Sequence, residues 1–169
     1  MNTITQDRLR ELFDYDPLTG LFTTRVSRGS MRAGKVSGSI NSCGYVTFLI
    51  DGRRYKAHRL AFLWMTGAFP DGEVDHINHV RSDNRWLNLR AATVSQNRAN
   101  QAMRGDNTSG VKGVCFDKAH QRYMAYIKVN GRFKNLGRFT DINDAAAAYE
   151  VAARKYFGDF AHAAVNPRP

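Results

Sequence analysis

The chain has 169 residues, which is enough for one ordinary domain or two small ones. Its 25 Lys and Arg residues against 15 Asp and Glu residues give a formal net charge of +10, and such a basic balance predicts a polyanionic partner, most often nucleic acid. No apolar run approaches the ~20 residues of a membrane-spanning helix, and the N-terminus lacks a secretory signal pattern. Cys43 and Cys115 are too few for a disulfide scaffold or for a zinc site built from two CxxC pairs.

Residues 1–56 predict a short helix followed by strands. The segment 5–13 places Leu9 and Leu12 on one helical face. Beyond a turn at residues 16–20 come three β-prone runs, at 21–26, 45–50 and 53–57. Asp51-Gly52 lies between the last two runs, which is a hairpin signal. We therefore expect a β-rich N-terminal extension.

Residues 57–104 predict two helices on either side of a polar, loop-rich stretch. The first helix covers 58–66 and ends before Gly67 and Pro70. A short strand is expected at residues 75 and 76, and a second helix at about 94–103. The glycine- and serine-containing stretch 104–110 has the composition of a linker to a further domain over 105–169.

Residues 105–169 predict a small antiparallel sheet with one helix. Three strands are expected, at 110–117, 122–129 and 132–139. Asn130-Gly131 between the last two is a type I′ hairpin signal. Asp141 can cap a helix over 142–157, whose alanines allow close packing on the sheet. The whole chain is thus expected to be α+β, with a three-stranded sheet backed by one helix at its C-terminal end.

Residues with chemical potential concentrate between positions 73 and 100. Asp75 and His76 are adjacent, Asn88 follows His76 by twelve positions, and Asn97 follows Asn88 by nine. Histidine is the side chain best suited to take a proton near neutral pH. Carboxylate and amide oxygens suit Mg²⁺ or Mn²⁺, which also retain water and bind substrate oxygens. This set of residues fits phosphodiester hydrolysis.

The segment resembles the HNH endonucleases, and within them the phage and intron-encoded subgroup that has Asn at the third position. The matching words are Val74-Asp75-His76-Ile77-Asn78, Ser82-Asp83-Asn84, Asn88-Leu89-Arg90 and Ser95-Gln96-Asn97. The resemblance implies a ββα-metal core over 57–104. It also implies that His76 is the general base, that Asp75 and Asn97 bind one Mg²⁺ or Mn²⁺, and that Asn88 fixes the loop that aims His76.

Several neighbouring residues keep two interpretations. Arg90 and Arg98 are either phosphate contacts or exposed charges, and His58 is either a packing residue or part of the site. His79 replaces a small residue that is frequent in relatives; it is expected to be merely exposed, and the alternative is an extra phosphate contact or a metal ligand. Since a structural zinc is not expected, the nuclease hairpin has to be held by apolar packing, for which the candidates are Val74, Ile77, Leu87, Leu89, Val94 and Ala99.

The C-terminal zone resembles the apetala/ethylene-response-factor DNA-binding domain. Its stretch 112–138 holds seven cations against one anion, with aromatic residues between them. The matching words are Gly113-Val114, Ala125-Tyr126-Ile127-Lys128 and Leu136-Gly137-Arg138-Phe139. The resemblance implies that the outer face of the sheet enters the major groove of double-stranded DNA. The positions implied as contacts are Lys112, Lys118, Arg122, Tyr126, Lys128, Lys134 and Asn135. Because most of these are Lys rather than Arg, we expect phosphate binding to dominate over base recognition.

These features predict a divalent-metal-dependent DNA endonuclease that nicks one strand, with homing to a long site as a plausible context. A catalytically silent DNA-binding regulator is the alternative, and RNA binding is a third hypothesis. The resemblance implies a cytoplasmic phage or mobile-element protein in a bacterial host, and the sequence implies no membrane or protein partner.

Overall fold

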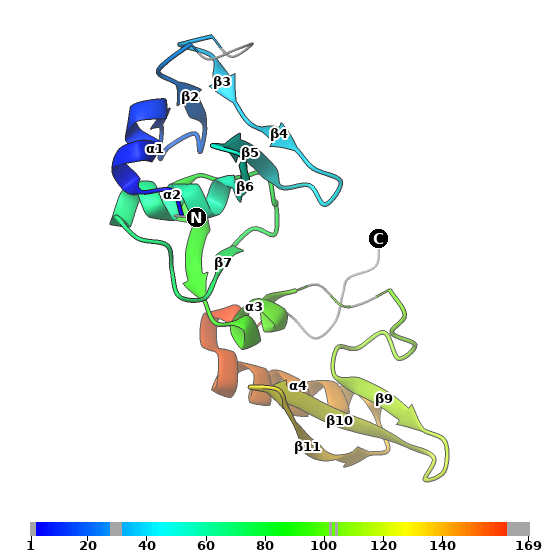
Figure 1. Cartoon of the computed structure of the whole chain (residues 1–169). Helices are drawn as coiled ribbons and strands as arrows, with labels where there is room; N and C mark the ends of the chain where they lie inside the picture. Colours follow the sequence, from blue (N-terminus) through cyan, green and yellow to red (C-terminus); the bar gives the residue numbers. More distant parts are fainter. Residues whose placement is uncertain (1–2, 28–31, 102, 104, 162–169) are drawn as a thin grey trace. The chain divides into compact units, whose positions relative to one another are not determined.

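The computed structural model describes residues 3–27, 32–101, 103 and 105–161. These residues form two compact units, Met1–Ala92 and Thr93–Pro169. Each unit contains both helices and strands (Figure 1), so the mixed class predicted from the sequence is confirmed. Within the described residues, no helix combines the length and apolar character needed to cross a bilayer.

The first unit consists of short elements. Its helices are α1 (Gln6–Leu12) and α2 (Ala57–Thr66). Its strands are β1 (Phe13–Tyr15), β2 (Phe22–Thr24), β3 (Val36–Ser37), β4 (Ser39–Ile40), β5 (Val46–Ile50), β6 (Arg53–Lys56), β7 (Glu73–His76) and β8 (Leu89–Ala92). All three sheets are antiparallel, with strand orders β1-β2-β3, β4-β5-β6 and β7-β8.

The predicted hairpin around Asp51-Gly52 is confirmed, since Ile50 pairs with Arg53 across the turn. The first helix is one residue shorter at each end than predicted. Thr5 is its N-cap and accepts a hydrogen bond from the Arg8 backbone N–H. Phe13 already has the extended angles φ −136° and ψ 156° and begins β1, a strand that the sequence pattern did not reveal.

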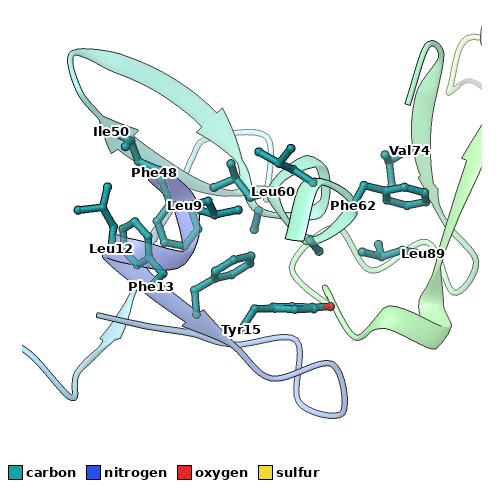
Figure 2. Close-up of a cluster of buried hydrophobic side chains, with 14 residues drawn as sticks. Leu9, Leu12, Phe13, Tyr15, Phe48, Ile50, Leu60, Phe62, Val74 and Leu89 are labelled. Atoms are coloured by element: carbon teal, nitrogen blue, oxygen red, sulfur yellow. The ribbon is translucent and has the colours of Figure 1, made fainter. Parts of the chain in front are cut away.

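One hydrophobic core holds the first unit together. The core draws buried side chains from α1, β1, β2, β5, α2, β7 and β8, and most of them are seen in Figure 2. Leu9 from α1 and Leu60 from α2 are completely buried in it, while Val74 of β7 and Leu89 of β8 belong to the same cluster. Residues before and after position 57 therefore share one core.

The prediction of how the β7–β8 hairpin packs is only partly right. Val74 and Leu89 are buried as expected, but Leu87 is 85% exposed and Ile77 is 46% exposed. Instead, Trp86 of the 3-10 turn Trp86–Asn88 packs against Phe62, with ring centroids 4.8 Å apart. Val94 is 47% exposed.

The second unit is built around one sheet and one long helix. Its helices are α3 (Val94–Asn100) and α4 (Ile142–Phe157), followed by the 3-10 turn Gly158–Phe160, and its strands are β9 (Val114–Asp117), β10 (Arg122–Val129) and β11 (Arg132–Phe139). The strand order is β11-β10-β9, with antiparallel pairing throughout. The predicted sheet and its helix are therefore confirmed (Figure 1), and Asp141 caps α4 by accepting from the Asn143 N–H.

The core of the second unit lies between the sheet and α4. Ala125 and Ile127 of β10 pack there with Ala145 and Tyr149 of α4. Ala99 of α3 is buried in this same cluster, so the helix surface assigned from the sequence to the nuclease hairpin contributes to the core of the second unit. The helix predicted to reach residue 103 ends at Asn100.

Candidate functional site

The β7–β8 hairpin carries the adjacent residues Asp75 and His76. Asp75 pairs with Arg90 in the register of the two strands, and His76 pairs with Leu89. The strand does not alternate between buried and exposed positions, because Val74, Asp75 and His76 are all buried. Two ionisable side chains are thus held in the interior of a small domain, where each needs a polar partner.

The loop from β7 to β8 is closed by Asn88. Its amide oxygen accepts from the Asn78 backbone N–H at 3.0 Å. Its amide nitrogen donates to Asn78 Oδ1 at 2.9 Å and to the Asp83 carbonyl at 2.8 Å. The Arg85 guanidinium, by hydrogen-bonding its carboxyl group, holds the pKa of Asp83 at about 2. Asn88 therefore joins the two ends of the loop that follows His76, and its importance for catalysis stays a prediction.

His79 has a backbone conformation that favours a small residue. Its φ of 63° lies in the left-handed region, which glycine adopts without steric cost. The side chain is exposed, as predicted.

His76 is oriented by Asn84, whose role the sequence did not reveal. His76 Nε2 lies 3.4 Å from Asn84 Oδ1, while the Asn84 amide nitrogen donates to the Ser82 carbonyl at 3.0 Å. Because Oδ1 can only accept, a hydrogen bond here requires the proton on Nε2, which leaves the lone pair of the neutral ring on Nδ1. Burial lowers the pKa of His76, and the hydrogen bond with Asn84 partly opposes that effect. The imidazole is therefore neutral at neutral pH and able to act as a base.

Two further rings surround His76. His58 of α2 meets it edge-on, with centroids 4.9 Å apart and planes at 86°. Tyr45 lies 5.2 Å from the His58 ring and 6.1 Å from the His76 ring. His58 is buried, and burial lowers its pKa to about 3. Among the described residues, its Nδ1 has no hydrogen-bond partner. The sequence left two interpretations of His58 open, and in the structure its ring lies against that of the proposed base.

Positive charge lies next to these rings without carboxylate partners. Lys56 Nζ is 4.3 Å from the centre of the Tyr45 ring, and the Arg81 guanidinium carbon is 5.2 Å from it. Within the described part of the chain, neither cation forms an ion pair, and Arg81 donates to the Cys43 carbonyl. An aromatic face holds a cation while leaving its charge available to an approaching anion.

Arg90 binds Asp75. Its Nε lies 2.9 Å from Asp75 Oδ2, and both side chains are largely buried, at 19% and 7% exposure. One carboxylate oxygen of the proposed metal ligand is thereby hydrogen-bonded to a guanidinium. The prediction of Arg90 as a phosphate contact stays untested, but its first partner in this structure is a carboxylate.

Asn97, the other proposed metal ligand, lies on α3 in the second unit. A capping box starts this helix: the Thr93 side chain accepts from the Gln96 N–H, while the Gln96 side chain accepts from the Thr93 N–H. No group of three or more His, Cys, Asp or Glu side chains arranged to hold a metal occurs in the described ranges. A carboxylate and an amide nevertheless fit Mg²⁺ or Mn²⁺, which take hard oxygen ligands and retain water.

The outer face of the C-terminal sheet carries a band of cations and aromatic rings. Opposite the buried residues Ala125 and Ile127, this face presents Arg122, Tyr126 and Lys128 from β10. Lys128 Nζ is 4.9 Å from the centre of the Phe133 ring, which meets Tyr126 at 5.7 Å. Arg122 and Lys128 are exposed, as are Lys118 in the β9–β10 turn and Arg98 on α3.

Lys134 does not lie on that face, contrary to the prediction. The pairing of β10 with β11 shifts between Ala125 and Tyr126, so Gly137 faces Ala125 but Asn135 faces Tyr126. This β-bulge exchanges the faces of the residues on one side of it. Lys134 therefore pairs with Ile127 on the helix side, with its Nζ 5.4 Å from the Tyr156 ring of α4.

Lys112 also differs from the predicted arrangement. Its Nζ donates to the Ala99 carbonyl at 2.6 Å and to the Gln101 carbonyl at 2.5 Å. Burial lowers the pKa of this ammonium to about 8. A groove of about 1040 Å³ runs along this region, and it is lined by residues that include Arg98, Lys112, Tyr126, Lys128 and Phe133.

Comparisons with known proteins agree with the sequence pattern. Residues 55–99 match the model of the HNH endonuclease family. A relative from Acanthamoeba polyphaga mimivirus, described as the uncharacterized HNH endonuclease L560, is 32% identical over 110 residues. The match covers 64% of this chain but 56% of the relative, so the chain spans little more than half the relative's length.

A solved structure described as "DNA binding and cleavage by the HNH homing endonuclease I-HmuI" is 22% identical, with a TM-score of 0.43 over 80% of this chain and 76% of that chain. The matched family segment at residues 55–99 includes Asp75, His76, Asn88 and Asn97. Residues 55–99 of this chain are thus similar to the HNH endonuclease family and carry all four residues proposed for the site.

Proposed function

We propose that this protein is a divalent-metal-dependent DNA endonuclease. The observation that carries the proposal is His76: a buried, neutral imidazole, oriented by Asn84 and adjacent to Asp75, on the hairpin of an HNH family segment. Buried ionisable groups with specific partners and shifted pKa values are typical of catalytic sites.

In this mechanism, His76 Nδ1 takes the proton of the attacking water, while Asn84 keeps the other ring nitrogen protonated. Asp75 and Asn97 would hold one Mg²⁺ or Mn²⁺, which would supply positive charge to neutralise the scissile phosphate and the departing oxygen. Lys56 and Arg81, held on the Tyr45 ring, attract the phosphate backbone toward the base. Hydrolysis leaves 5′-phosphate and 3′-hydroxyl ends. One such site in a chain favours nicking of a single strand.

The C-terminal sheet is the proposed DNA-binding surface. Its outer face combines exposed cations with aromatic rings, as expected for an apetala/ethylene-response-factor-like domain that binds double-stranded DNA. Lys128 and Arg122 are the strongest candidates for contacts with phosphates. Together with Tyr126 and Asn135, these residues lie on one continuous face, whereas Lys112 and Lys134 have partners elsewhere.

A catalytically silent DNA-binding regulator is the second candidate. The observation that favours it is the Asp75–Arg90 ion pair, because a divalent cation has to share the carboxylate with a guanidinium. The two candidates make opposite predictions for cleavage and the same prediction for binding.

The deciding experiment incubates supercoiled plasmid with the protein and Mg²⁺ or Mn²⁺. We expect open circles to form, with no product in EDTA. His76→Ala should abolish nicking while preserving the gel shift of a DNA duplex. His120→Ala, in the exposed β9–β10 turn, is the matched histidine control and should nick normally. A parent protein that binds DNA but never nicks it would support the regulator instead.

A further inference from the structure

The helix that carries Asn97 is attached to the C-terminal sheet at both ends. Near its start, Ser95 Oγ accepts a hydrogen bond of 3.1 Å from the backbone N–H of Asn130, at the tip of the β10–β11 hairpin. Two residues after Asn97, Ala99 is buried with the residues that pack between the sheet and α4. Both attachments lie within two residues of Asn97 on either side.

Lys112 forms the third attachment. Its ammonium donates to the carbonyls of Ala99 and Gln101, where Gln101 leaves the helix with φ −62° and ψ 143°. The last carbonyls of a helix have no partner within the helix and carry partial negative charge, so a cation there both satisfies and stabilises them. Lys112 stands two residues before β9. A single side chain thus links the end of α3 to the edge of the sheet.

The hydrogen bonds of Lys112 do not fit the role of a DNA contact. Its ammonium donates to main-chain oxygens at 2.6 and 2.5 Å, and the residue is partly buried, unlike the exposed Lys128. In agreement, burial lowers the pKa of Lys112.

We infer that Lys112 is a positioning residue for Asn97: it fixes the end of α3 to the C-terminal sheet, so that the DNA-binding unit determines how the metal-binding amide is held. This inference rests on the proposed function, because it needs Asn97 as a ligand of the divalent cation. The sheet then has two tasks, binding DNA through its outer face and supporting α3 through Lys112 and Asn130.

The test measures metal binding apart from turnover. In a His76→Ala background with a bound DNA duplex, the affinity for Mn²⁺ is obtained from the electron paramagnetic resonance signal of the free ion. Lys112→Met, which keeps the aliphatic stem, should weaken Mn²⁺ binding by about tenfold, the scale on which groups that orient a metal ligand act. Lys112→Arg retains donors for both carbonyls and should restore most of the affinity. Ser95→Ala removes the hydrogen bond from Asn130 and should shift the affinity in the same direction.

Two controls separate positioning from general loss of stability and from DNA contact. Asp141→Ala removes the cap of α4 and so destabilises the same unit, yet should leave the Mn²⁺ affinity unchanged. In EDTA, Lys112→Met should bind the duplex with the same salt dependence as the parent. Lys128→Ala should instead reduce the slope of log K against log[salt] by about 0.9, as expected for the loss of one phosphate contact.

The outcomes distinguish the inference from the proposed function. Unchanged Mn²⁺ affinity in both Lys112→Met and Ser95→Ala, or a reduced salt slope in Lys112→Met with normal Mn²⁺ affinity, would overturn the inference. The proposed function fails if the parent never nicks plasmid. A parent that binds Mn²⁺ in a Lys112-dependent way without nicking would keep the positioning role and reject the nuclease.

Discussion

Asn84 offers the sharpest test of how His76 is activated. Replacing it by Ala removes the acceptor 3.4 Å from His76 Nε2 and leaves a buried ring N–H without its partner. The unfolding free energy should fall by about 1–3 kcal/mol, the usual cost of an unsatisfied buried group. Loss of orientation should lower the single-turnover rate of nicking by about 10²-fold, against a loss of up to about 10⁴-fold when the base itself is removed.

The pH dependence of the nicking rate gives this prediction a direction. Nicking needs neutral His76, so its rate falls in acid as the imidazole becomes protonated. The hydrogen bond with Asn84 raises the pKa of His76 against the lowering by burial. Asn84→Ala should therefore move the acid limb to lower pH, and Asn84→Asp, which places a carboxylate beside the ring, should move it to higher pH.

Tyr15→Phe is the matched control for Asn84. The Tyr15 hydroxyl donates to the Asn84 backbone carbonyl at 2.7 Å in the same buried region. Its loss should destabilise the protein on a similar scale of about 1 kcal/mol while leaving the Asn84 side chain and the acid limb in place. Rates are measured with plasmid and Mn²⁺ from pH 5 to 9. Identical acid limbs in the parent, Asn84→Ala and Asn84→Asp would refute the assignment of Nδ1 as the base.

Three further predictions concern stability and DNA binding. Burial sets the pKa of His58 at about 3, below its ordinary value of 6.5, so its contribution to stability is complete above pH 6.5 and is lost as the pH falls toward 3. Urea unfolding should give an unfolding free energy that is lower by about 2 kcal/mol at pH 5 than at pH 7 because of this group. His58→Phe should remove most of this difference between the two pH values, and an unaltered difference would contradict the role of His58. Gly20→Ala should lower the unfolding free energy by about 1–3 kcal/mol more than Gly52→Ala does. Both substitutions share the backbone strain of a φ near +75°, so this difference reflects packing. A Cβ on Gly20 would lie 2.4 Å from the Asn84 and Arg85 backbone, while one on Gly52 meets nothing within 4 Å; equal unfolding free energies would reject this packing argument. Lys128→Ala should reduce the salt slope of duplex binding by about 0.9 and Lys134→Ala by less, because Lys134 lies on the helix side of the sheet. The reverse order in gel shifts would show that the bulge does not set the binding face.

Local signals in the sequence predicted most of the elements. Asp51-Gly52 and Asn130-Gly131 marked two hairpins, and Asp141 marked the start of α4, because turn and cap chemistry depends on a few adjacent residues. The face of Lys134 could not be predicted this way. It depends on one extra residue in β11, and simple alternation gives no sign of that bulge.

The candidate site was predictable in its residue types but not in its contacts. The spacing of Asp75, His76, Asn88 and Asn97 indicated the chemistry, whereas the partners of these residues depend on tertiary packing. Asn84 belongs to the matching segment Ser82-Asp83-Asn84, but the sequence assigned it no role. Tyr45 and His58 lie 31 and 18 positions before His76 in the sequence, yet their rings lie beside it in the structure. The sequence shows the charges of Arg90 and Lys112, but not that the nearest oxygens are those of the Asp75 carboxylate and of main-chain carbonyls.

The shared core of the first unit has a practical consequence for protein engineering. The stretch that matches the HNH family begins inside β6 and ends inside α3. Its helix α2 is buried against α1 and β1, and Ala99 belongs to the core of the second unit. Transplanting residues 55–99 alone into a foreign scaffold would expose apolar surface at both ends of the segment. Chimaeric nucleases should therefore retain everything from α1 through α4.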